Sequence, residues 1–405
     1  MLLEWLADGT VTSVPGFLAA GVACGIKGRD VADLALVTCE RPCAAAGLFT
    51  TNRFAAAPVL YDRQVLAANP WVRAVAINSG CANACTGEEG LADAHEMASL
   101  VAAAVGCRAA EVLVMSTGVI GVRLPMERLR KGIPRAAQAL SAEGGGAAAR
   151  AIMTTDTQPK ACAVRTEVLG RPVTVAGMAK GSGMIHPNMA TMLALMATDA
   201  AATPQVLDAL LRRAAQRSFN AVTVDGDTST NDTVLLLASS SAGHAQLTDA
   251  DSPAAAPLAE ALLAVAVRLA QAIARDGEGA SHFVTVIVRG AANDADARLA
   301  AKAVANSPLV KTAIYGGDPN WGRVLCAVGY SGCQVDPARA ALWFGDVALV
   351  AGGRPLGYDE RQAAAVLQQP EVTITIDLGL GAGEATVWTC DLTHRYVDIN
   401  AHYRT

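Results

Sequence analysis

The sequence predicts an α+β fold, a mixed α/β arrangement of layered sheets and helices in two halves around a loop at residues 180–191. Short runs of Val, Ile, Leu and Ala alternate with glycine-containing turns, which is the pattern of buried strands. Longer stretches repeat Ala and Leu at helical spacing, and no low-complexity linker or tandem repeat interrupts them. Hydrophobic residues make up 52% of the 405 residues, so a large core can form.

The N-terminal part is expected to consist mainly of strands. Residues 14–60 contain short apolar runs punctuated by glycines, which predicts strands joined by turns. Residues 31–37 alternate as a half-buried strand does. Up to residue 177, we further expect strands at 72–77, 111–115, 161–166 and 172–177, and helices at 88–105 and 125–140.

A new pattern begins after the central loop. Thr203 and Pro204 form an N-cap followed by proline at the first helical position, which predicts a helix to about residue 217. Residues 220–224 are predicted to be a strand. The acidic loop 225–232 imitates the start of an EF-hand but lacks its glycine and its final glutamate, so a calcium site is not expected. The remaining expected elements are helices at 253–275 and 293–306, and strands at 283–288, 371–377 and 384–390.

Charge and apolar patterning exclude several classes of protein. The net charge is −5 and no basic block occurs, which argues against a nucleic-acid partner and a polybasic membrane surface. No apolar run reaches the ~18 residues that a membrane span needs. The N-terminus has acidic residues and lacks the basic segment of a signal peptide. We therefore expect a cytoplasmic protein with no membrane and no nucleic-acid partner.

The ten cysteines raise the question of a metal site. Cys39 with Cys43, and Cys81 with Cys85, have a four-residue spacing that a four-thiolate zinc site can use. Each pair lies in an otherwise ordinary segment, and most of the cysteines have apolar or small neighbours. Reduced, buried thiols are the simpler interpretation, so no metal and no cofactor are expected.

Residues 178–196 contain the most unusual stretch of the chain. Lys180 precedes two glycines and a proline within a few residues, so the backbone must turn tightly. The hydroxyl of Thr191, next to the small Ala190, then opens an apolar run. A basic residue, a tight turn and a hydroxyl can build a nucleophile site. Alone, the same pattern also fits a loop between two strands in which Thr191 merely starts the second.

Three other loops could contact a ligand. Residues 78–87 are small and polar after a strand, which suits either backbone N–H donation to a ligand or an ordinary strand-to-helix loop. Thr117 and Gly118 end another strand and could donate to an oxyanion. Glu278 stands between two glycines at a helix-to-strand corner. An exposed carboxylate there is usually inert, but it could reach an amino group of a ligand.

Residues 180–193 resemble the self-cleavage motif of the ArgJ family, the bacterial ornithine acetyltransferases and glutamate N-acetyltransferases of arginine biosynthesis. Six further motifs follow the family's order along nearly the whole chain, and such a set is highly specific. They occupy residues 21–27, 116–121, 153–157, 225–232, 276–280 and 317–323. Cys81 departs from the asparagine expected in the family. The resemblance implies an ArgJ/DmpA-like fold of the N-terminal-nucleophile type.

The resemblance also implies that the precursor cuts itself between Ala190 and Thr191. The products would be an alpha chain of residues 1–190 and a beta chain of residues 191–405. A threonine hydroxyl is a poor nucleophile at its free pKa and needs an adjacent base. Cleavage would create an α-amino group on Thr191 with a reference pKa of about 7.7–8.0, so a base of suitable pKa would lie beside the hydroxyl.

By the same resemblance, the Thr117 hydroxyl and the Gly118 N–H would form an oxyanion hole. Thr191 would take the acetyl group from N2-acetylornithine and pass it to glutamate in ping-pong fashion through an acyl-Thr191 intermediate. Lys180 would pair with a substrate carboxylate, and Glu278 would suit the ornithine ammonium. The remaining substrate positions map onto Thr157, Asn400 and Thr405. Small-molecule substrates, an α2β2 heterotetramer and, in some members, acetyl-CoA as a co-substrate are also implied.

Three other functions remain open at this level. A related N-terminal-nucleophile aminopeptidase or amidase would share the self-cleavage but pass the acyl group to water. Lys180 together with Glu278 favours an amino-acid acceptor instead. A binding protein would never cleave, and an acetyltransferase of specialised metabolism would act on other acetylated amino acids. His186 invites comparison with a Ser-His pair, but the α-amine already supplies a base, so His186 is assigned no role.

Overall fold

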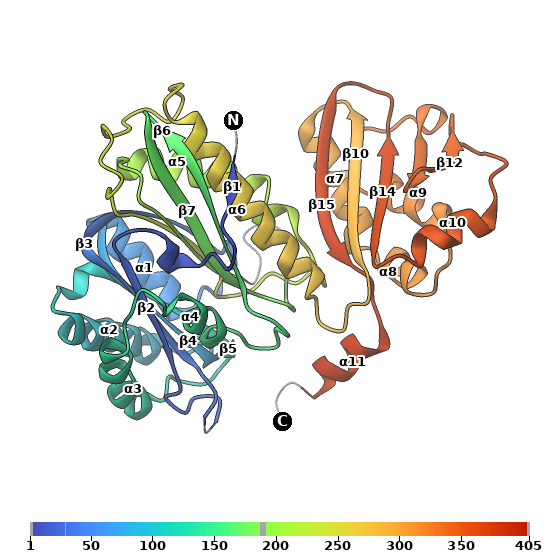
Figure 1. The fold of residues 1–405 in the computed structure, drawn as a ribbon. Coiled ribbons are helices and arrows are strands. Elements are labelled where there is room, and N and C mark those ends of the chain that lie inside the picture. Colours follow the sequence, from blue (N-terminus) through green and yellow to red (C-terminus); the bar gives the residue numbers. More distant parts are fainter. Residues whose placement is uncertain (1–2, 29, 187–191, 403–405) are drawn as a thin grey trace. The chain divides into compact units, whose positions relative to one another are not determined.

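The computed structural model describes residues 3–28, 30–186 and 192–402 (Figure 1). The chain divides into two compact units. The first comprises residues 1–181, 188–220 and 227–269, and the second comprises residues 182–187, 221–226 and 270–405. The first unit therefore contains residues from both sides of the predicted cleavage site. The cleavage itself remains a prediction.

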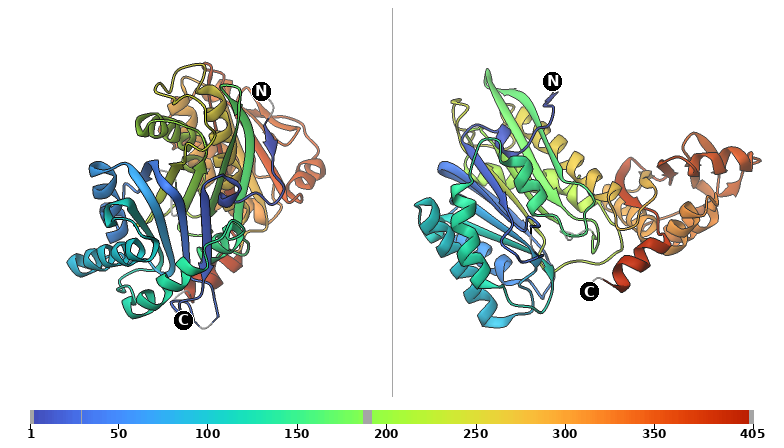
Figure 2. Two further views of the ribbon diagram at one scale, coloured as in Figure 1. Left: turned by 60° about the vertical axis from the view of Figure 1, so that its left-hand side comes forward. Right: turned by 60° about the horizontal axis from the view of Figure 1, so that its bottom comes forward.

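A nine-stranded sheet is the framework of the first unit (Figures 1 and 2). The strand order is β1-β6-β7-β8-β9-β3-β4-β5, and β2 pairs with β3. Pairs β4/β5 and β8/β9 are parallel. The strands are β1 (Glu4–Trp5), β2 (Phe17–Val22), β3 (Leu34–Phe49), β4 (Trp71–Cys81), β5 (Val112–Val119), β6 (Lys160–Val168), β7 (Arg171–Lys180), β8 (Leu193–Thr198) and β9 (Thr233–Ala238).

Strand β3 folds this sheet into two layers. Its first half pairs with β2 and β4, whereas residues 44–49 pair with β9. The register with β4 shifts between Thr38 and Cys43, on either side of Pro42, which cannot donate to a ladder. A strand that changes partners at such an irregularity forms a corner between layers. The core shared by the two layers includes Val37, Ile77, Met115, Met178, Leu195 and Leu235.

Helices cover the first unit's sheet. Helices α1, α2 and α3 form a second core with the opposite face of β3, β4 and β5. Helix α4 packs on β2, and α5 packs on β3. The bounds are α1 (Ala57–Ala68), α2 (Gly87–Val105), α3 (Met126–Gln138), α4 (Gly145–Ala151), α5 (Pro204–Gln216) and α6 (Ala256–Arg275), with short 3-10 turns at Val11–Ser13, Ala109–Glu111 and Phe219–Ala221.

The second unit has its own six-stranded sheet, in the order β13-β12-β11-β14-β10-β15. Val284, Val286 and Ile374 line its core, together with residues of the helices that pack on the sheet. The strands are β10 (Phe283–Ala291), β11 (Ala341–Phe344), β12 (Val347–Ala351), β13 (Arg354–Pro355), β14 (Glu371–Asp377) and β15 (Gly383–Cys390). The helices are α7 (Asp294–Asn306), α8 (Pro308–Tyr315), α9 (Trp321–Gly329), α10 (Glu360–Leu367) and α11 (His394–Ala401), with a 3-10 turn at Pro337–Arg339.

The α+β prediction is confirmed, and three local predictions are wrong. Residues 57–60 begin helix α1, with a proline in its first turn, where the sequence suggested only strands and turns. Residues 34–37 are buried on both faces because helices cover one side of β3 and the second layer covers the other. Residues 220–224 form a 3-10 turn and one isolated bridge, Val222 to Trp388, instead of a strand.

Among the described residues, one helix is long and apolar enough to cross a membrane by length and composition alone, although charged residues interrupt its apolar run. It is α6, whose most apolar 18-residue window has a mean hydropathy of 1.5. Half of that window is buried inside the protein, as in the core helix of a globular fold. Val265 and Leu269 of α6 would lie 3.2 and 2.8 Å from a side chain at Gly177 of β7, so this part of the helix packs closely on the sheet.

Candidate active site

Thr117 and Gly118 lie at the end of β5, where the sequence predicted an oxyanion hole. Their register partners in β4 are Ser79 and Gly80, and Thr117 is only 5% exposed. Gly118 has φ +129°, and a Cβ there would lie 2.3 Å from the carbonyl carbon of Gly80. Only glycine fits this close approach with positive φ. The backbone N–H of residue 118 is therefore held in a conformation that other residues rarely adopt.

Lys180 at the end of β7 contacts Thr117, although four strands separate β5 and β7 in the sheet order. Its Nζ donates to Thr117 Oγ1 at 3.2 Å, and its side chain is buried. A threonine hydroxyl has one proton and two acceptor lone pairs. Because Lys180 occupies a lone pair, the Thr117 proton can be donated to another acceptor, and the nearby positive charge polarises the O–H bond. This pair suits stabilisation of a developing oxyanion.

Asp156 joins the 153–157 turn to the Lys180 backbone. Its Oδ1 accepts from Lys160 Nζ and Gly181 N, both at 2.7 Å, and its Oδ2 accepts from Thr154 N at 2.9 Å. The side chains of Asp156 and Lys160 are both 1% exposed. Burial alone would raise the pKa of Asp156, but the charges of Lys180 and Lys160 and these hydrogen bonds outweigh it and lower the pKa to about 2. Asp156 therefore remains a carboxylate at neutral pH.

A second lysine lies close to this cluster. Lys27 Nζ donates to Met153 O at 2.9 Å. Burial lowers the pKa of Lys27, and the charge of Lys180 lowers it further, whereas the carboxylates of Asp33 and Asp156 oppose the shift. Asp33 is fully buried and accepts the backbone N–H groups of residues 24–27 at 2.5 to 3.1 Å. The 21–27 motif is thus a turn that Asp33 holds in place.

The predicted nucleophile, Thr191, and its neighbour Ala190 lie outside the described residues. Met192, the next residue, donates its N–H to Asp232 Oδ1 at 3.2 Å. Asp232 is fully buried, and its Oδ2 has no hydrogen-bond partner among the described residues. Burial raises the pKa of Asp232 well above its usual value, against the opposing effects of the Met192 N–H and the Lys180 charge. Burial therefore favours the protonated form of Asp232.

Thr157 follows Asp156 directly and is exposed. Of the predicted site residues, the first unit brings Lys180 and the Thr117–Gly118 pair into one region of linked hydrogen bonds. Asp156 carries that link, because its carboxylate accepts the Gly181 N–H beside Lys180.

Glu278, in the second unit, is buried and not exposed as the sequence suggested, with only 7% of its surface accessible. Its N–H donates to Ser182 O at 2.8 Å. A Cβ on Gly183 would lie 2.3 Å from the Glu278 carboxyl carbon, so the carboxylate rests directly against glycine backbone. Gly183 therefore makes room for Glu278, a reason that the sequence alone did not reveal.

Asn400 lies on α11 and donates to Glu278 Oε2 at 2.7 Å. Its Nδ2 also donates to Tyr396 O at 3.0 Å. Thr393 caps this helix by accepting from Arg395 N at 3.1 Å, and its hydroxyl donates to Gly279 O at 2.7 Å. The C-terminal helix is thereby attached to the Glu278 corner. Thr405 lies outside the described residues.

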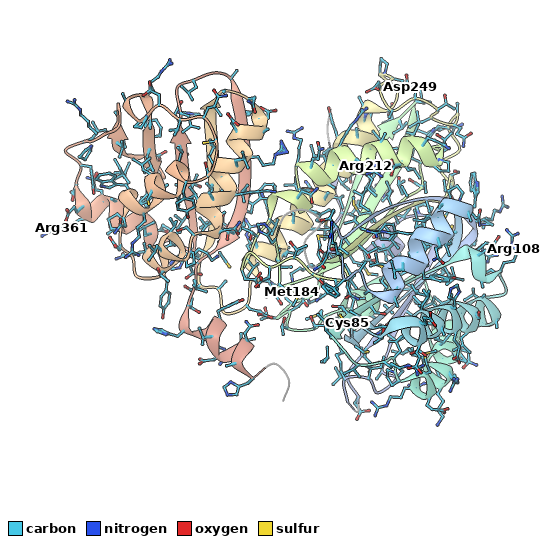
Figure 3. All side chains as sticks on the ribbon, turned by 180° about the vertical axis from the view of Figure 1, so that it is seen from behind. Cys85, Arg108, Met184, Arg212, Asp249 and Arg361 are labelled. Carbon is cyan, nitrogen blue, oxygen red and sulfur yellow. The ribbon has the colours of Figure 1, made fainter. Side chains whose placement is uncertain are left out.

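Other residues of the motifs organise loops. Asp225 accepts the N–H groups of Met184 (Figure 3) and Ile185 at 2.5 and 2.9 Å, so its carboxylate orders this loop. His186 Nδ1 lies 3.3 Å from Asn306 Nδ2 and 3.5 Å from Thr223 Oγ1. These neighbours anchor the His186 ring within the second unit.

The cysteines and the acidic motifs form no candidate metal site among the described residues. All ten cysteines are free thiols, and no group of three or more His, Cys, Asp or Glu among the described residues could hold a metal ion. In the 317–323 motif, Asn320 caps α9 and Arg323 donates to Leu309 O at 2.8 Å. That motif therefore contributes a helix start, and no catalytic group is evident in it.

Comparisons with known proteins agree with the resemblance. The model of the ArgJ family matches residues 18–405. The arginine biosynthesis bifunctional protein ArgJ of Symbiobacterium thermophilum is 55% identical over 405 residues, which is 100% of both chains. The protein of the same name from Geobacter sulfurreducens is 53% identical over 394 residues, 97% of this chain and 100% of that one. The solved ornithine acetyltransferase of Mycobacterium tuberculosis, in complex with ornithine, is 47% identical over 46% of this chain and 99% of that chain, with a TM-score of 0.44.

Proposed function

Because the chain belongs to the ArgJ family and is an acyltransferase of arginine biosynthesis, we propose that it transfers the acetyl group of N2-acetylornithine to glutamate. The products are ornithine and N-acetylglutamate. The observation that carries this proposal is the buried contact of Lys180 Nζ with the Thr117 hydroxyl beside Gly118. Two donors at a strand end, one of them polarised by a cation, suit the negative oxygen of a tetrahedral intermediate.

We further propose that the chain matures by cleavage between Ala190 and Thr191. Thr191 Oγ then attacks the acetyl carbonyl of acetylornithine, and the Thr191 α-amine takes the hydroxyl proton. The oxyanion accepts from the Thr117 O–H and the Gly118 N–H. Collapse breaks the amide bond, and the α-ammonium returns its proton to the departing amine of ornithine. The acetyl group remains on Thr191 as an ester.

The second half of the proposed reaction reverses these roles. The amine of glutamate attacks the acetyl ester, the α-amine of Thr191 accepts the amine proton, and the Thr191 hydroxyl is regenerated. Both substrates carry an α-carboxylate, for which Lys180 and Thr157 are the candidate partners. Glu278, with Asn400 fixing its carboxylate, is the candidate partner for the ornithine side-chain ammonium, and Thr405 completes the substrate set.

Several wider features belong to the same proposal. No metal or organic cofactor enters these steps, and acetyl-CoA is a candidate second acetyl donor. The alpha and beta chains are proposed to assemble as an α2β2 heterotetramer in the cytoplasm.

The test is an exchange assay with labelled acetylornithine and varied glutamate. We expect label in N-acetylglutamate. We also expect parallel double-reciprocal lines, because ornithine leaves the acetylated enzyme before glutamate binds to it. Release of labelled acetate at the same rate with and without glutamate would show transfer to water instead. That result would contradict the proposal and favour the aminopeptidase or amidase function.

A further inference from the structure

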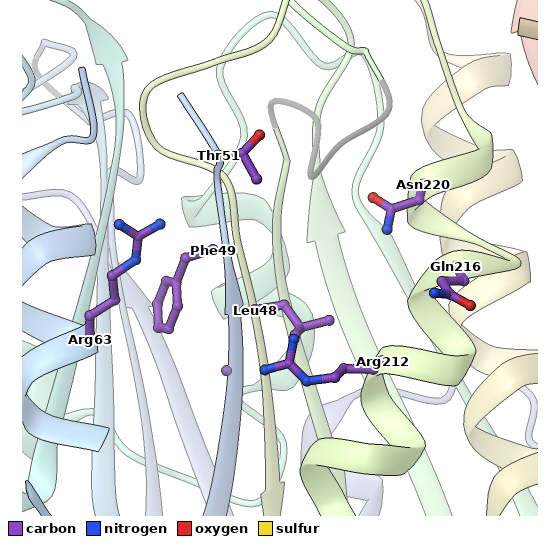
Figure 4. A pocket seen from close by; sticks show the side chains of 8 residues that line it. Leu48, Phe49, Thr51, Arg63, Arg212, Gln216 and Asn220 are labelled. Atoms are coloured by element: carbon purple, nitrogen blue, oxygen red, sulfur yellow. The ribbon is translucent and has the colours of Figure 1, made fainter. Parts of the chain in front are cut away.

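A pocket of about 370 Å³ opens in the first unit between the end of β3 and helices α1 and α5 (Figure 4). Arg63 and Phe49 lie on one side, and Arg212, Gln216 and Asn220 lie on the other (Figure 4). Its lining residues are Gly47, Leu48, Phe49, Thr51, Arg63, Arg212, Gln216 and Asn220. The proposed acetyl transfer uses none of them.

The pocket lining is basic in a protein whose net charge is −5. Two arginines line it, and no aspartate or glutamate does. Arg63 Nη2 donates to Thr50 O at 2.5 Å, and the guanidinium lies 5.7 Å from the centre of the Phe49 ring. Arg63 is therefore oriented by its neighbours while its charge has no carboxylate partner among the described residues.

Arg212 is partly neutralised but keeps donors. Asp208, one helical turn earlier, accepts from Nε at 2.8 Å and from Nη2 at 3.0 Å. In the part of the chain that the structure describes, Nη1 of Arg212 has no acceptor. A guanidinium presents five N–H donors in a planar fork, which matches the oxygens of a phosphate. Together, the two arginines offer donors from both walls of the pocket.

The loop beside the pocket is fixed by hydrogen bonds. Thr50 Oγ1 donates to Ser229 O at 2.6 Å, and Asn52 Nδ2 donates to Thr228 O at 3.0 Å. Asn52 Oδ1 accepts from Phe54 N at 2.9 Å, which closes a turn and leaves the Phe54 ring 72% exposed. The pocket wall that contains Thr51 is therefore held in a fixed position.

The pocket lies near the strand that follows the predicted nucleophile. In the sheet, Phe49 pairs with Thr233, and Thr233 pairs with Leu193. Two strand spacings of ~4.8 Å place the two backbones about 10 Å apart. The link is also direct, because Asp232 O accepts from Thr50 N at 2.9 Å and Asp232 Oδ1 accepts from Met192 N.

We propose that this Arg63–Arg212 pocket binds the phosphate groups of a small phosphorylated molecule. Arginine–phosphate hydrogen bonds are strong and bidentate, and the pocket has the volume and the polar lining for a pyrophosphate. Two sources share this chemistry. One is a phosphorylated acyl thioester that donates an acetyl group to Thr191, and the other is a free polyphosphate or nucleotide.

Acetyl transfer from the thioester rests on the proposed function, because it uses the same nucleophile and base. Thr191 Oγ attacks the thioester carbonyl, the C–S bond breaks, and the thiol leaves with the proton that the Thr191 α-amine had accepted. The acetyl ester formed is the same as the one from acetylornithine.

The experiment measures pyrophosphate binding to the purified full-length protein by titration calorimetry at low salt. We expect Arg63→Gln and Arg212→Gln each to weaken binding at least about tenfold. Arg213→Gln is the matched control, because Arg213 neighbours Arg212 on α5 but pairs with Asp251 and does not line the pocket. We expect less than about a twofold change for it. Thermal unfolding of each variant shows that the protein is folded.

A second measurement separates the two sources. If the KM for acetyl-CoA in glutamate acetylation rises in Arg63→Gln and Arg212→Gln by more than the KM for acetylornithine, the thioester is the ligand. If pyrophosphate binding weakens while the KM for acetyl-CoA is unchanged, a free phosphorylated anion is the ligand. Unchanged pyrophosphate binding in both variants, or equal weakening in all three, would overturn the proposal. Pyrophosphate binding needs no turnover, so this outcome is independent of the proposed acetyl transfer.

Discussion

The two units hold their candidate carboxylates in different ways. Asp156, in the first unit, accepts hydrogen bonds from Lys160 and from two backbone N–H groups, and the charge of Lys180 further stabilises its carboxylate. Glu278, in the second unit, lies at a helix-to-strand corner against Gly183 and takes its side-chain hydrogen bond from Asn400 on the exposed helix α11. Both residues are buried, but the Asp156 carboxylate accepts three hydrogen bonds, whereas Asn400 Nδ2 is the one donor to the Glu278 carboxylate among the described residues. We infer that sheet residues fix the reacting groups and that loop and terminal residues recognise the substrate.

Removing the buried charge of Asp156 should cause the largest loss of unfolding free energy. In Asp156→Asn, Lys160 keeps a buried charge without its carboxylate, which typically costs about 3–5 kcal/mol. Urea unfolding measures the loss. Asp208→Asn is the control, because the Asp208–Arg212 pair is 41% and 61% exposed and its loss should cost less than about 1 kcal/mol. Equal losses in both variants would contradict the distinction between enclosed and exposed charge.

The same carboxylate gives a pH dependence with a definite sign. The folded pKa of Asp156 is about 2, below the ordinary value of 3.8. The unfolded chain therefore binds a proton first as the pH falls, so this stabilisation is complete above the ordinary pKa and is lost as the pH falls from 3.8 toward 2. The difference in stability between wild type and Asp156→Asn should shrink over that window.

Removing the hydroxyl at the strand end should affect catalysis and not stability. Thr117→Ala should lower kcat by about 10²–10³, the usual cost of one oxyanion-hole donor. Thr117→Ser keeps the hydroxyl that Lys180 contacts and should recover most of the rate. A Thr117→Ala enzyme with wild-type kcat would show that this pair does not face the oxyanion.

Changing the corner carboxylate should separate the two half-reactions. Glu278→Gln removes the charge proposed for the ornithine ammonium but keeps the shape and an acceptor for Asn400. The KM for acetylornithine should rise about 10- to 100-fold, the cost of losing a hydrogen bond to a charged group. The KM for glutamate, which has no side-chain ammonium, should change far less. Equal increases for both substrates would contradict a recognition role.

Substitution of Asp232 should cause the smallest change in unfolding free energy at neutral pH. Because burial raises the pKa of this carboxyl and so favours its neutral form, Asp232→Asn is the substitution that keeps a neutral group of similar shape. The folded pKa lies above the unfolded value, so the carboxyl makes wild-type stability fall as the pH rises above 3.8. Asp232→Asn should lack this decline and lose less than about 1 kcal/mol at neutral pH. A larger loss at neutral pH would show that the carboxylate form is present.

Sequence patterns predicted the parts of the site that are local. Thr117 and Gly118 are neighbours at a strand end, and the glycine-rich turn after Lys180 follows from its composition. The Lys180–Thr117 contact could not be predicted, because it spans 63 positions and depends on the bend in β3 that folds the sheet.

Burial explains the other omissions. Asp156 and Asp232 lie within recognised motifs, but their roles depend on how deeply they are enclosed and on their partners, which a sequence does not specify. Their position as acids inside otherwise small, hydroxyl-rich turns was the available signal. Residues 57–60 are a short apolar run, which periodicity alone cannot assign to a helix or a strand, so the start of helix α1 was not distinguished from strands.

The most direct test of the account is an intact-mass measurement after incubation with acetylornithine in the absence of glutamate. The account predicts two chains, residues 1–190 and 191–405, with one acetyl group on the second chain only. The Thr191→Ala variant should give a single uncut chain that carries no acetyl group. An uncut wild-type chain, or a cut chain that never carries acetyl, would contradict catalysis through an acetylated Thr191.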